Sequence, residues 1–497
     1  MIFQLFVPVL LLLLFTLAGL SCIKPKMFPP GPAWFPFVGC FLQFQQLYRK
    51  IGYCHLIWAK WAEKYGPIIG LKLGKDKIVV VSGYKAIKHA YSKEDFDGRP
   101  DGFFFRMRTF HQRLGVVFVD GELWSEQRKF TTRHLRTLGM GTNSMENIIN
   151  EEVEALIRSL NDKIGQNKES MELELHNLCD ISILNTLWAV VAGKRFELED
   201  PRLIKMFKLQ HASFRAIDMS GGLLNQMPFL RHVMPERTGY KNLMENTLAN
   251  YQFLRETLEE HKETHVPGEH NDLIDAFIDE IDGKKDSNFT DEQLLALCQD
   301  LFMAGSETTS TTLGFLFEKF LIYQKMQSRV QNDIDAVVGR GRLPNLSDRT
   351  QLPYLEAIIM ETQRLISIAP ITVPHRATKD VEIYGHVVPK DTTVLYSIWS
   401  IHMEKEHWKD PENFRPERFL NKSGDAVIKD EWFMPFGLGK RRCLGEAQAK
   451  NSLFLFMAGL LQNFSFVPIA GGIKDEKPFD GVTLSPKPFK GLIKRRL

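Results

Sequence analysis

A single cysteine, Cys443, follows Lys440, Arg441 and Arg442 in the glycine-rich stretch FMPFGLGKRRCLGE (433–446). Positive charges and backbone amides can stabilise a thiolate, and the helical run after it would point the positive end of its dipole at the sulfur. Such a thiolate can act as a nucleophile, a redox sensor or a metal ligand. A cysteine hydrolase also needs a paired histidine as base, and no histidine in the sequence is singled out for that role.

A second polar group, AGSETTSTT (304–312), interrupts an apolar run. Glu307, Thr308 and Thr309 are costly inside an apolar helix unless something uses them. Ala304 and Thr308 are four residues apart and therefore share one face. Small residues there leave room for a ligand, which would meet a hydroxyl and a carboxyl, the parts of a proton relay. The alternative is a helix bend eased by hydrogen bonds from threonine to the backbone.

Charged residues also recur at helical spacing in ETQR, where Glu361 and Arg364 share a face. Alone, such a pair is a surface ion pair of small effect. Arg418 lies in the proline-stiffened loop PENFRPERF (411–419). If Arg418 reaches this pair, the three side chains form a buried structural lock.

Trp124 and Arg128, in LWSEQRKF, place a flat ring and a cation on one helix face. The pair could hold an anionic ligand, or the ring and cation could simply pack together.

The elements that must position these residues are mostly helical. Between 120 and 370 helical patterns dominate, whereas the β-branched run at 70–83 predicts a small sheet, and short strands and loops follow residue 370. Thr290 and Gln293 form a capping-box pattern that predicts the start of a helix of about thirty residues. Because that helix is apolar nearly all round, it must cross a large core. The fold class is mainly α with a minor β part.

The N-terminal segment predicts a membrane anchor over residues 1–23, because its first twenty residues are almost uninterruptedly apolar. Lys24 and Lys26 follow the apolar run, which places the rest of the chain in the cytosol. A cleaved signal peptide is the alternative. Residues 24–40 are a proline-rich linker that acts as a stiff spacer, and 41–497 form a single large domain.

Composition excludes several classes of protein. Hydrophobic residues make up 44% and charged residues 25% of the chain, and the net charge is +3, so neither disorder nor nucleic-acid binding is indicated. Six cysteines without paired spacing exclude zinc ribbons, covalent c-type haem and a disulfide framework. The 36 phenylalanines, against 11 tyrosines, hint at apolar cavities.

The pattern F-G-x-G-x-R-x-C-x-G, from Phe436 to Gly445, resembles the haem-binding loop of the cytochrome P-450 superfamily. Three more motifs of that superfamily precede it in the expected order: A-G-x-E-T, E-x-x-R and P-E-R-F. The resemblance covers essentially the whole chain. It implies a cytochrome P-450 fold, a single haem domain with a long central helix.

The resemblance also implies the cofactor, haem b, and the roles of the residues around it. Cys443 would be the axial thiolate on the iron. Thr308 and Glu307 match the alcohol and acid that supply protons to the reaction, and Glu361, Arg364 and Arg418 match a structural triad. The residues that match the remaining cofactor-binding positions are Trp124, Arg128, His375, Arg441 and Phe436, with Arg99 as a further candidate for the propionates.

As a member of this superfamily the chain would be a monooxygenase in the endoplasmic reticulum membrane. Electrons would come from an NADPH-dependent flavoprotein reductase and oxygen from O2. The basic residues that could form the docking face for that reductase are Arg128, Lys129, Arg133, Arg136, Lys440 and Arg442.

The substrate implied is lipophilic, because the segments that match the pocket of the superfamily are apolar. They are 99–118, the helix around Phe302, 367–374 and 479–486. Further stretches look most like insect enzymes of the animal drug- and hormone-metabolising branch, which points to epoxidation of methyl farnesoate in juvenile hormone synthesis. A steroid or ecdysteroid hydroxylase and a broad detoxifying enzyme are the alternatives. Glu307 and Thr308 argue against a haem sensor or electron carrier.

Overall fold

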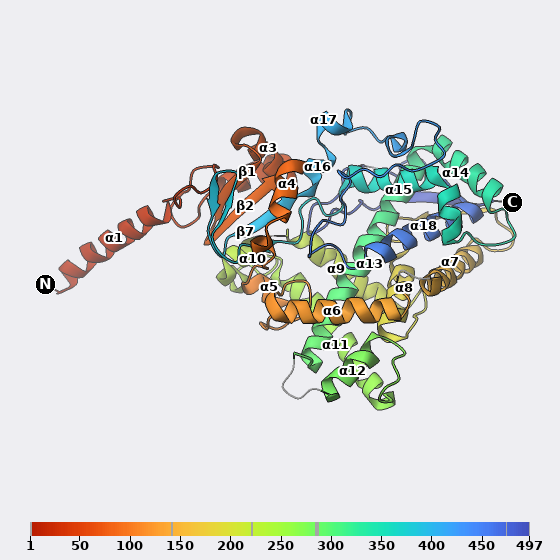
Figure 1. The fold of residues 1–497 in the computed structure, drawn as a ribbon, viewed down its shortest axis with the longest axis horizontal. Helices are drawn as coiled ribbons and strands as arrows, with labels where there is room; N and C mark the ends of the chain where they lie inside the picture. Colours follow the sequence, from red (N-terminus) through yellow and green to blue (C-terminus); the bar gives the residue numbers. More distant parts are fainter. Residues whose placement is uncertain (1, 141–142, 220–221, 284–287, 474, 497) are drawn as a thin grey trace.

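The computed structural model describes residues 2–140, 143–219, 222–283, 288–473 and 475–496. Helices make up most of the body, and a small sheet lies at the end from which α1 projects (Figure 1). This confirms the predicted class, mainly α with a minor β part. The helices are α1 (Ile2–Ser21), α2 (Phe41–Ile51), α3 (Cys54–Tyr65), α4 (Tyr84–Tyr91), α5 (Phe103–Met107), α6 (Gly121–Thr137), α7 (Asn143–Ile164), α8 (Asp180–Ala192), α9 (Pro201–Ala216), α10 (Gly222–Gln226), α11 (Tyr240–Thr264), α12 (Leu273–Gly283), α13 (Asp291–Ile322), α14 (Gln324–Val337), α15 (Pro353–Ile366), α16 (Ile398–His402), α17 (Lys405–Trp408) and α18 (Glu446–Asn463).

Three small sheets complete the fold. The strands are β1 (Ile68–Leu73), β2 (Asp76–Ser82), β3 (Ser170–Glu174), β4 (His375–Arg376), β5 (Val381–Ile383), β6 (His386–Val388), β7 (Thr393–Ser397), β8 (Phe464–Val467) and β9 (Lys490–Arg495). The largest sheet has the order β1-β2-β7-β4, in which β2 and β7 are parallel. The β1–β2 hairpin is the sheet predicted from the run at 70–83.

The central helix is α13, which passes through the middle of the body (Figure 1). Its start is set as predicted, because the Thr290 side chain accepts a hydrogen bond from the backbone N–H of Gln293. The reciprocal half of the capping box is missing, since the Gln293 amide instead bonds the backbone of Gly115. Helices α8, α11, α15 and α18 pack around α13, so that nearly every face of it is buried.

Gly314 is the point at which α13 approaches the chain just before α8 most closely. A Cβ at this position would lie 2.6 Å from the carbonyl oxygen of His176, which is backbone and cannot turn away. We therefore expect Gly314→Ala to lower the free energy of unfolding by about 1–3 kcal/mol, although alanine favours a helix by about 1 kcal/mol. Urea unfolding would measure this. The control is Gly283→Ala in α12, where a Cβ meets nothing within 4 Å and no such loss is expected.

The N-terminal segment differs in part from its prediction. Residue 1 and the side chains of residues 2–8, which belong to the predicted anchor, lie outside what the structure describes. Within the described part of the chain, no helix combines the length and hydropathy needed to cross a membrane, so the anchor over 1–23 is not confirmed. The segment 24–40 does not stand free as a spacer: Phe28 and Trp34 are buried in the core beneath β1 and β2.

Candidate functional site

A cavity of about 420 Å³ lies beside α13 in the interior of the helical body. Its walls are mostly apolar and come from the segments predicted to line a pocket, with Phe118, Leu301, Val373 and Val482 among them. Phe302 itself faces the opposite way and packs against Trp188. Cys443, which lies near the C-terminal end of the sequence, also lines this cavity.

The loop that presents Cys443 is built by two glycines with positive φ, Gly437 (71°) and Gly439 (69°), a conformation that other residues adopt at a cost. The backbone N–H of Cys443 donates to the carbonyl of Phe436 and closes the loop. The helix expected after the cysteine is α18, which begins at Glu446.

The expected stabilisation of the Cys443 thiolate by neighbouring cations and backbone amides is confirmed only in part. Lys440 pairs with Glu94 (2.7 Å), and Arg442 forms two bonds with Glu446 (2.5 and 2.6 Å). Although the sulfur is accessible from the cavity, the protein encloses it, and this burial raises the pKa of the thiol. The Gly445 amide, Arg128 and, more weakly, Arg442 oppose the rise without cancelling it. A metal ion bound to the sulfur would favour the thiolate form.

Trp124, Arg128 and Arg441 come together at one wall of the cavity, as the sequence predicted. The Arg441 guanidinium lies 3.8 Å above the Trp124 ring, and its Nε donates to the carbonyl of Asp97. Its Nη1 is buried without a hydrogen-bond partner. Burial lowers the pKa of Arg441 to about 9. An unpartnered cationic donor beside a cavity suits an anionic group such as a haem propionate, so these residues fit that cofactor.

His375 and Arg99 also line the cavity, but they differ in how many of their hydrogen-bonding atoms already bond the protein. Nδ1 of His375 bonds the carbonyl of Phe96, and burial holds its pKa well below the usual range. Arg99 donates to the backbone carbonyls of Val117, Val373 and Pro374. Arg99 thus already ties three loop carbonyls together, which makes it the less available anion ligand.

The structure separates the two residues expected to form an alcohol–acid pair. Thr308 lines the cavity, and its hydroxyl donates to the carbonyl of Ala304 (2.8 Å). Glu307 does not line the cavity; it is only 1% exposed and forms an ion pair with His211. Gly305 serves helix packing as well as the cavity, since a Cβ there would lie 2.6 Å from Cδ2 of Leu187.

Glu361, Arg364 and Arg418 form one buried cluster. Arg364 donates to both carboxylate oxygens of Glu361 (2.7 and 2.9 Å), and Arg418 donates to one of them (3.0 Å). The side chains of Glu361 and Arg364 are fully buried and that of Arg418 is 5% exposed. The cluster lies outside the cavity wall, so it touches no ligand there.

His402, which sequence reasoning missed, links this cluster to the cysteine loop. Its carbonyl accepts a bond from Arg364 (2.6 Å), and its ring Nε2 accepts one from the backbone N–H of Met434 (3.1 Å). Burial, reinforced by Arg364, lowers the pKa of His402 to about 3. The ring is therefore neutral, as its acceptor role requires.

We expect His402 to make the protein less stable in acid. In the unfolded chain the His402 ring takes up a proton below about pH 6.5, whereas in the folded protein it stays neutral down to about pH 3. Protons therefore favour the unfolded state, and the free energy of unfolding falls as the pH drops between these two values. The loss is up to about 1.4 kcal/mol per pH unit. Urea unfolding at about pH 7 and about pH 5.5 should show a larger drop for the wild type than for His402→Gln. Equal drops would contradict the prediction.

A buried ion pair, Arg108 with Asp300, also lines the cavity and was not foreseen. Asp300 further accepts the backbone N–H groups of Val116 and Val117 (2.7 and 2.9 Å). The signal was present, because Asp300 is a lone carboxylate within the apolar run LLALCQDLFMAG. The pair gives an otherwise apolar wall one strongly polar patch.

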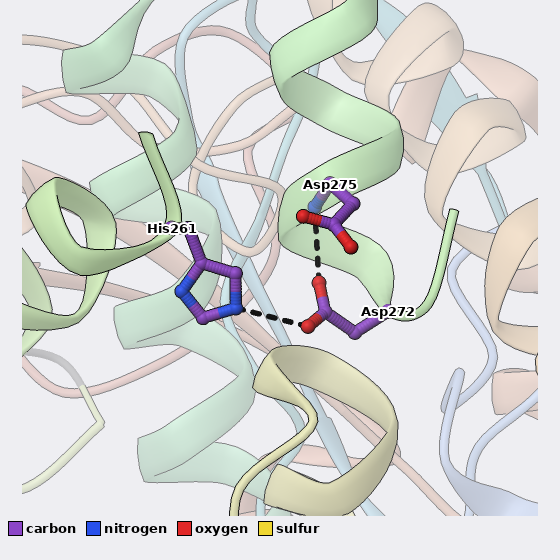
Figure 2. Close-up of side chains that lie close together, drawn as sticks. All are labelled: His261, Asp272 and Asp275. Carbon is purple, nitrogen blue, oxygen red and sulfur yellow. Dashed lines mark hydrogen bonds and ion pairs between the residues drawn. The ribbon is translucent and has the colours of Figure 1, made fainter. Parts of the chain in front are cut away.

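One further cluster of metal-ligand residue types occurs among the described residues: His261, Asp272 and Asp275 (Figure 2). Their polar atoms are already used within the protein. His261 bonds Asp272 (2.9 Å) and the carbonyl of Thr257, and Asp272 caps α12 by accepting the N–H of Asp275. These hydrogen bonds connect α11 to the start of α12 and stabilise the packing of the two helices.

Comparison with known proteins decides the family. The profile of the cytochrome P450 family matches residues 29–493. The chain belongs to the cytochrome P450 family. Farnesoate epoxidase of Bombyx mori is 40% identical over 470 residues, 94% of each chain. The probable cytochrome P450 303a1 of Drosophila melanogaster is 39% identical over 95% of each chain, and cytochrome P450 2J2 of Homo sapiens is 33% identical over 93% of this chain and 90% of that one.

Membership confirms the resemblance seen in the sequence. This cytochrome P450 is a monooxygenase, an oxidoreductase whose cofactor is haem b. Its reaction consumes O2, acts on a lipophilic molecule and draws electrons from a redox partner. The cavity, with Cys443 on one side and the unpartnered donor of Arg441 on another, is the space in the described structure whose residues fit the cofactor.

Proposed function

We propose that this cytochrome P450 epoxidises methyl farnesoate, an apolar ester. The 40% identity, over nearly the full length of both chains, to a farnesoate epoxidase carries the farnesoate skeleton of the substrate. The choice of the ester over the acid rests on the Asp300 carboxylate at the cavity wall. The cavity supports it, because most of its wall is apolar while the Arg108–Asp300 pair supplies one polar patch. An ester has oxygen atoms that can accept hydrogen bonds at such a patch.

In this proposal the Cys443 sulfur would bind the haem iron, and Phe436 would lie beside the cofactor. Trp124, Arg128, His375 and Arg441 hold the propionates. When bound, haem b would activate O2, which is the source of the inserted oxygen atom. Thr308 orders proton donors at the cavity wall and Glu307 passes protons toward them. Glu361, Arg364 and Arg418 keep the segment behind the cysteine loop rigid.

The redox partner is an NADPH-dependent flavoprotein reductase that docks on the surface of α6. Lys129, Arg133 and Arg136 are exposed there, and an acidic partner would be attracted to them. Arg128 contributes less to this surface, because it is half-buried and its Nη2 donates to the carbonyl of Arg442. Lys440 and Arg442 already pair with carboxylates of this chain.

We further propose that residues 1–23 anchor the protein in the endoplasmic reticulum membrane, with the catalytic domain in the cytosol. Helix α1 projects from the body (Figure 1), and its described part exposes one apolar side chain after another: Val9, Leu10, Leu11, Leu12, Leu13, Leu14, Phe15, Leu17 and Leu20. Such a surface is stable only when something apolar covers it. Alkaline extraction of membranes should release a chain that lacks residues 1–23 and retain the full chain.

The substrate is tested by turnover with purified reductase and NADPH. We expect the epoxide of methyl farnesoate as the main product, and slower turnover of farnesoic acid, because a carboxylate entering the cavity would meet the carboxylate of Asp300 as well as Arg108. A saturated methyl ester of similar length is the control, since it fits the same wall but has no double bond to epoxidise. Preference for a steroid over methyl farnesoate would contradict the proposal.

A further inference from the structure

Two histidines at the end of α11 and two aspartates at the start of α12 meet beside the loop that joins these helices. One ligand atom each from His261, Asp272 and Asp275 lies within 4.8 Å of the other two (Figure 2). His265 follows His261 by one helical turn, and its Nδ1 lies 3.6 Å from Oδ1 of Asp275. None of the four side chains lines the cavity, so binding of cofactor or substrate there does not use them.

The ring of His265 carries an atom that the hydrogen bonds of this cluster leave unused. Its side chain is 6% exposed, and Nδ1 is buried without a hydrogen-bond partner. Nε2 of the same ring lies 2.8 Å from Oδ1 of Asp279. A carboxylate can only accept, so Nε2 carries the hydrogen and Nδ1 turns a lone pair toward Asp275. Two buried acceptors so placed repel each other unless a cation, either a proton or a metal ion, lies between them.

The other three side chains are each held by the protein through one polar atom. Nδ1 of His261 donates to the carbonyl of Thr257 (2.7 Å), which leaves Nε2 to face Oδ2 of Asp272 (2.9 Å). Oδ1 of Asp272 accepts the backbone N–H of Asp275 (2.9 Å). Oδ2 of Asp275 accepts the backbone N–H of Asn271 (3.2 Å), and its Oδ1 faces His265. Outer partners of this kind fix the tautomer and the orientation of metal ligands.

The ligand types and their distances suit zinc. Bonds from Zn²⁺ to nitrogen or oxygen are about 2.0–2.2 Å long, so two ligands of a tetrahedral ion lie about 3.3–3.6 Å apart. The separation of 3.6 Å between His265 and Asp275 agrees with this range. The hydrogen bond between His261 and Asp272 would lengthen by about 0.5 Å as the ion replaces the shared proton. Imidazole nitrogens favour zinc over Mg²⁺ and Ca²⁺, which prefer oxygen ligands.

The cluster lies close to solvent and has space beside one of its ligand atoms. Residues 266–271 of the joining loop are exposed, so an ion need not cross the core. A Cβ at Gly193 would lie 3.0 Å from Oδ2 of Asp272, and the glycine leaves that side of the oxygen open.

We propose that this cluster binds one Zn²⁺ ion, which ties the end of α11 to the start of α12 through four ligands: His261, His265, Asp272 and Asp275. His265 is the first residue after α11, so its ring can move the short way into the coordination sphere. Four protein ligands complete a tetrahedral site and leave no position for a substrate, which makes the site structural and not catalytic.

Zinc binding is measured on the full-length holoenzyme, purified without a histidine tag and treated with a chelator. After dialysis against Zn²⁺ alone, we expect one bound zinc ion per haem and a zinc X-ray absorption spectrum with nitrogen and oxygen neighbours at about 2.0–2.2 Å. A sulfur neighbour at about 2.3 Å would place the ion on a cysteine and overturn the proposal. No uptake of zinc would also overturn it, because a proton would then be the cation between His265 and Asp275.

His265→Ala is the first variant, because it removes the ligand atom that makes no hydrogen bond within the protein. Loss of an outer partner already costs about 10- to 100-fold in metal affinity, so we expect loss of this ligand to cost more than about 100-fold. The carbon monoxide spectrum of the reduced variant should stay normal, since His265 does not line the cavity. If His265→Ala does not fold, Asp275→Asn tests the same coordination. Wild-type zinc affinity in either folded variant would refute the ligand set.

Two other histidines serve as controls. His407 of α17 also pairs with an aspartate, Asp430 (2.7 Å), and His407→Ala should bind zinc as the wild type does. His270 is exposed and bonds Oδ2 of Asp279 (2.7 Å), so the zinc affinity of His270→Ala should stay within about tenfold of the wild type. Loss of zinc in His270→Ala together with its retention in Asp275→Asn would place the ion at Asp279 and contradict the proposal.

Discussion

Cys443→Ala is expected to purify without the spectrum of a thiolate-ligated haem. No other cysteine opens into the cavity within the described structure, and an alanine methyl group cannot bind iron. Loss of an outer partner of a metal ligand typically costs about 10- to 100-fold in affinity or activity, so loss of the ligand itself should exceed that. The measurement is the carbon monoxide difference spectrum of the reduced protein, together with haem content and reductase-supported turnover.

Cys298→Ala is the matched control for this experiment. Cys298 is also a free cysteine, but it is buried within α13 and does not line the cavity. Its removal should lower stability slightly and leave the haem spectrum unchanged. A normal thiolate spectrum in Cys443→Ala would require another axial ligand and would refute the assignment.

Glu361→Gln is expected to cause the largest loss of stability of any single change considered. The Glu361 carboxylate faces two buried guanidinium groups, Arg364 and Arg418, and also accepts the backbone N–H of Arg415. Removing its charge leaves the buried Arg364 without a counter-ion and Arg418 with only the more distant Asp410 (3.4 Å). Breaking a buried ion pair in this way costs about 3–5 kcal/mol. Urea unfolding followed by circular dichroism would measure this. Haem content should fall in parallel, because Arg364 holds His402 and His402 holds Met434 at the cysteine loop.

The control is Glu154→Gln on α7, where the glutamate pairs with Arg158 across one helical turn. Both side chains are more than half exposed there, so solvent screens the pair. The expected loss is below about 0.5 kcal/mol. Similar losses at Glu361 and Glu154 would mean that burial does not decide the strength of the Glu361 cluster.

Much of the fold and of the site follows from patterns confined to a few neighbouring residues. Thr290 caps α13 because the N–H group that it accepts is three residues away, and the β-branched run at 70–83 gives the β1–β2 hairpin. The pairing of Glu361 with Arg364 follows from helical spacing alone. The motif around Cys443 and the three motifs that precede it pointed to the family, and the family profile confirmed it. All these interactions are short in sequence, so propensity and spacing decide them.

Only the tertiary structure decided which distant partner each charged group takes. Lys440 and Arg442 form ion pairs with Glu94 and Glu446, and Glu307 forms one with His211, which α9 brings to it. Burial then sets the charge states, raising the pKa of His211 and lowering that of His402. The sequence by itself determined the fold class and the family, and it predicts Cys443 as the iron ligand. The proton path and the electrostatics around the site depend on packing between helices far apart in the chain, which no local pattern encodes.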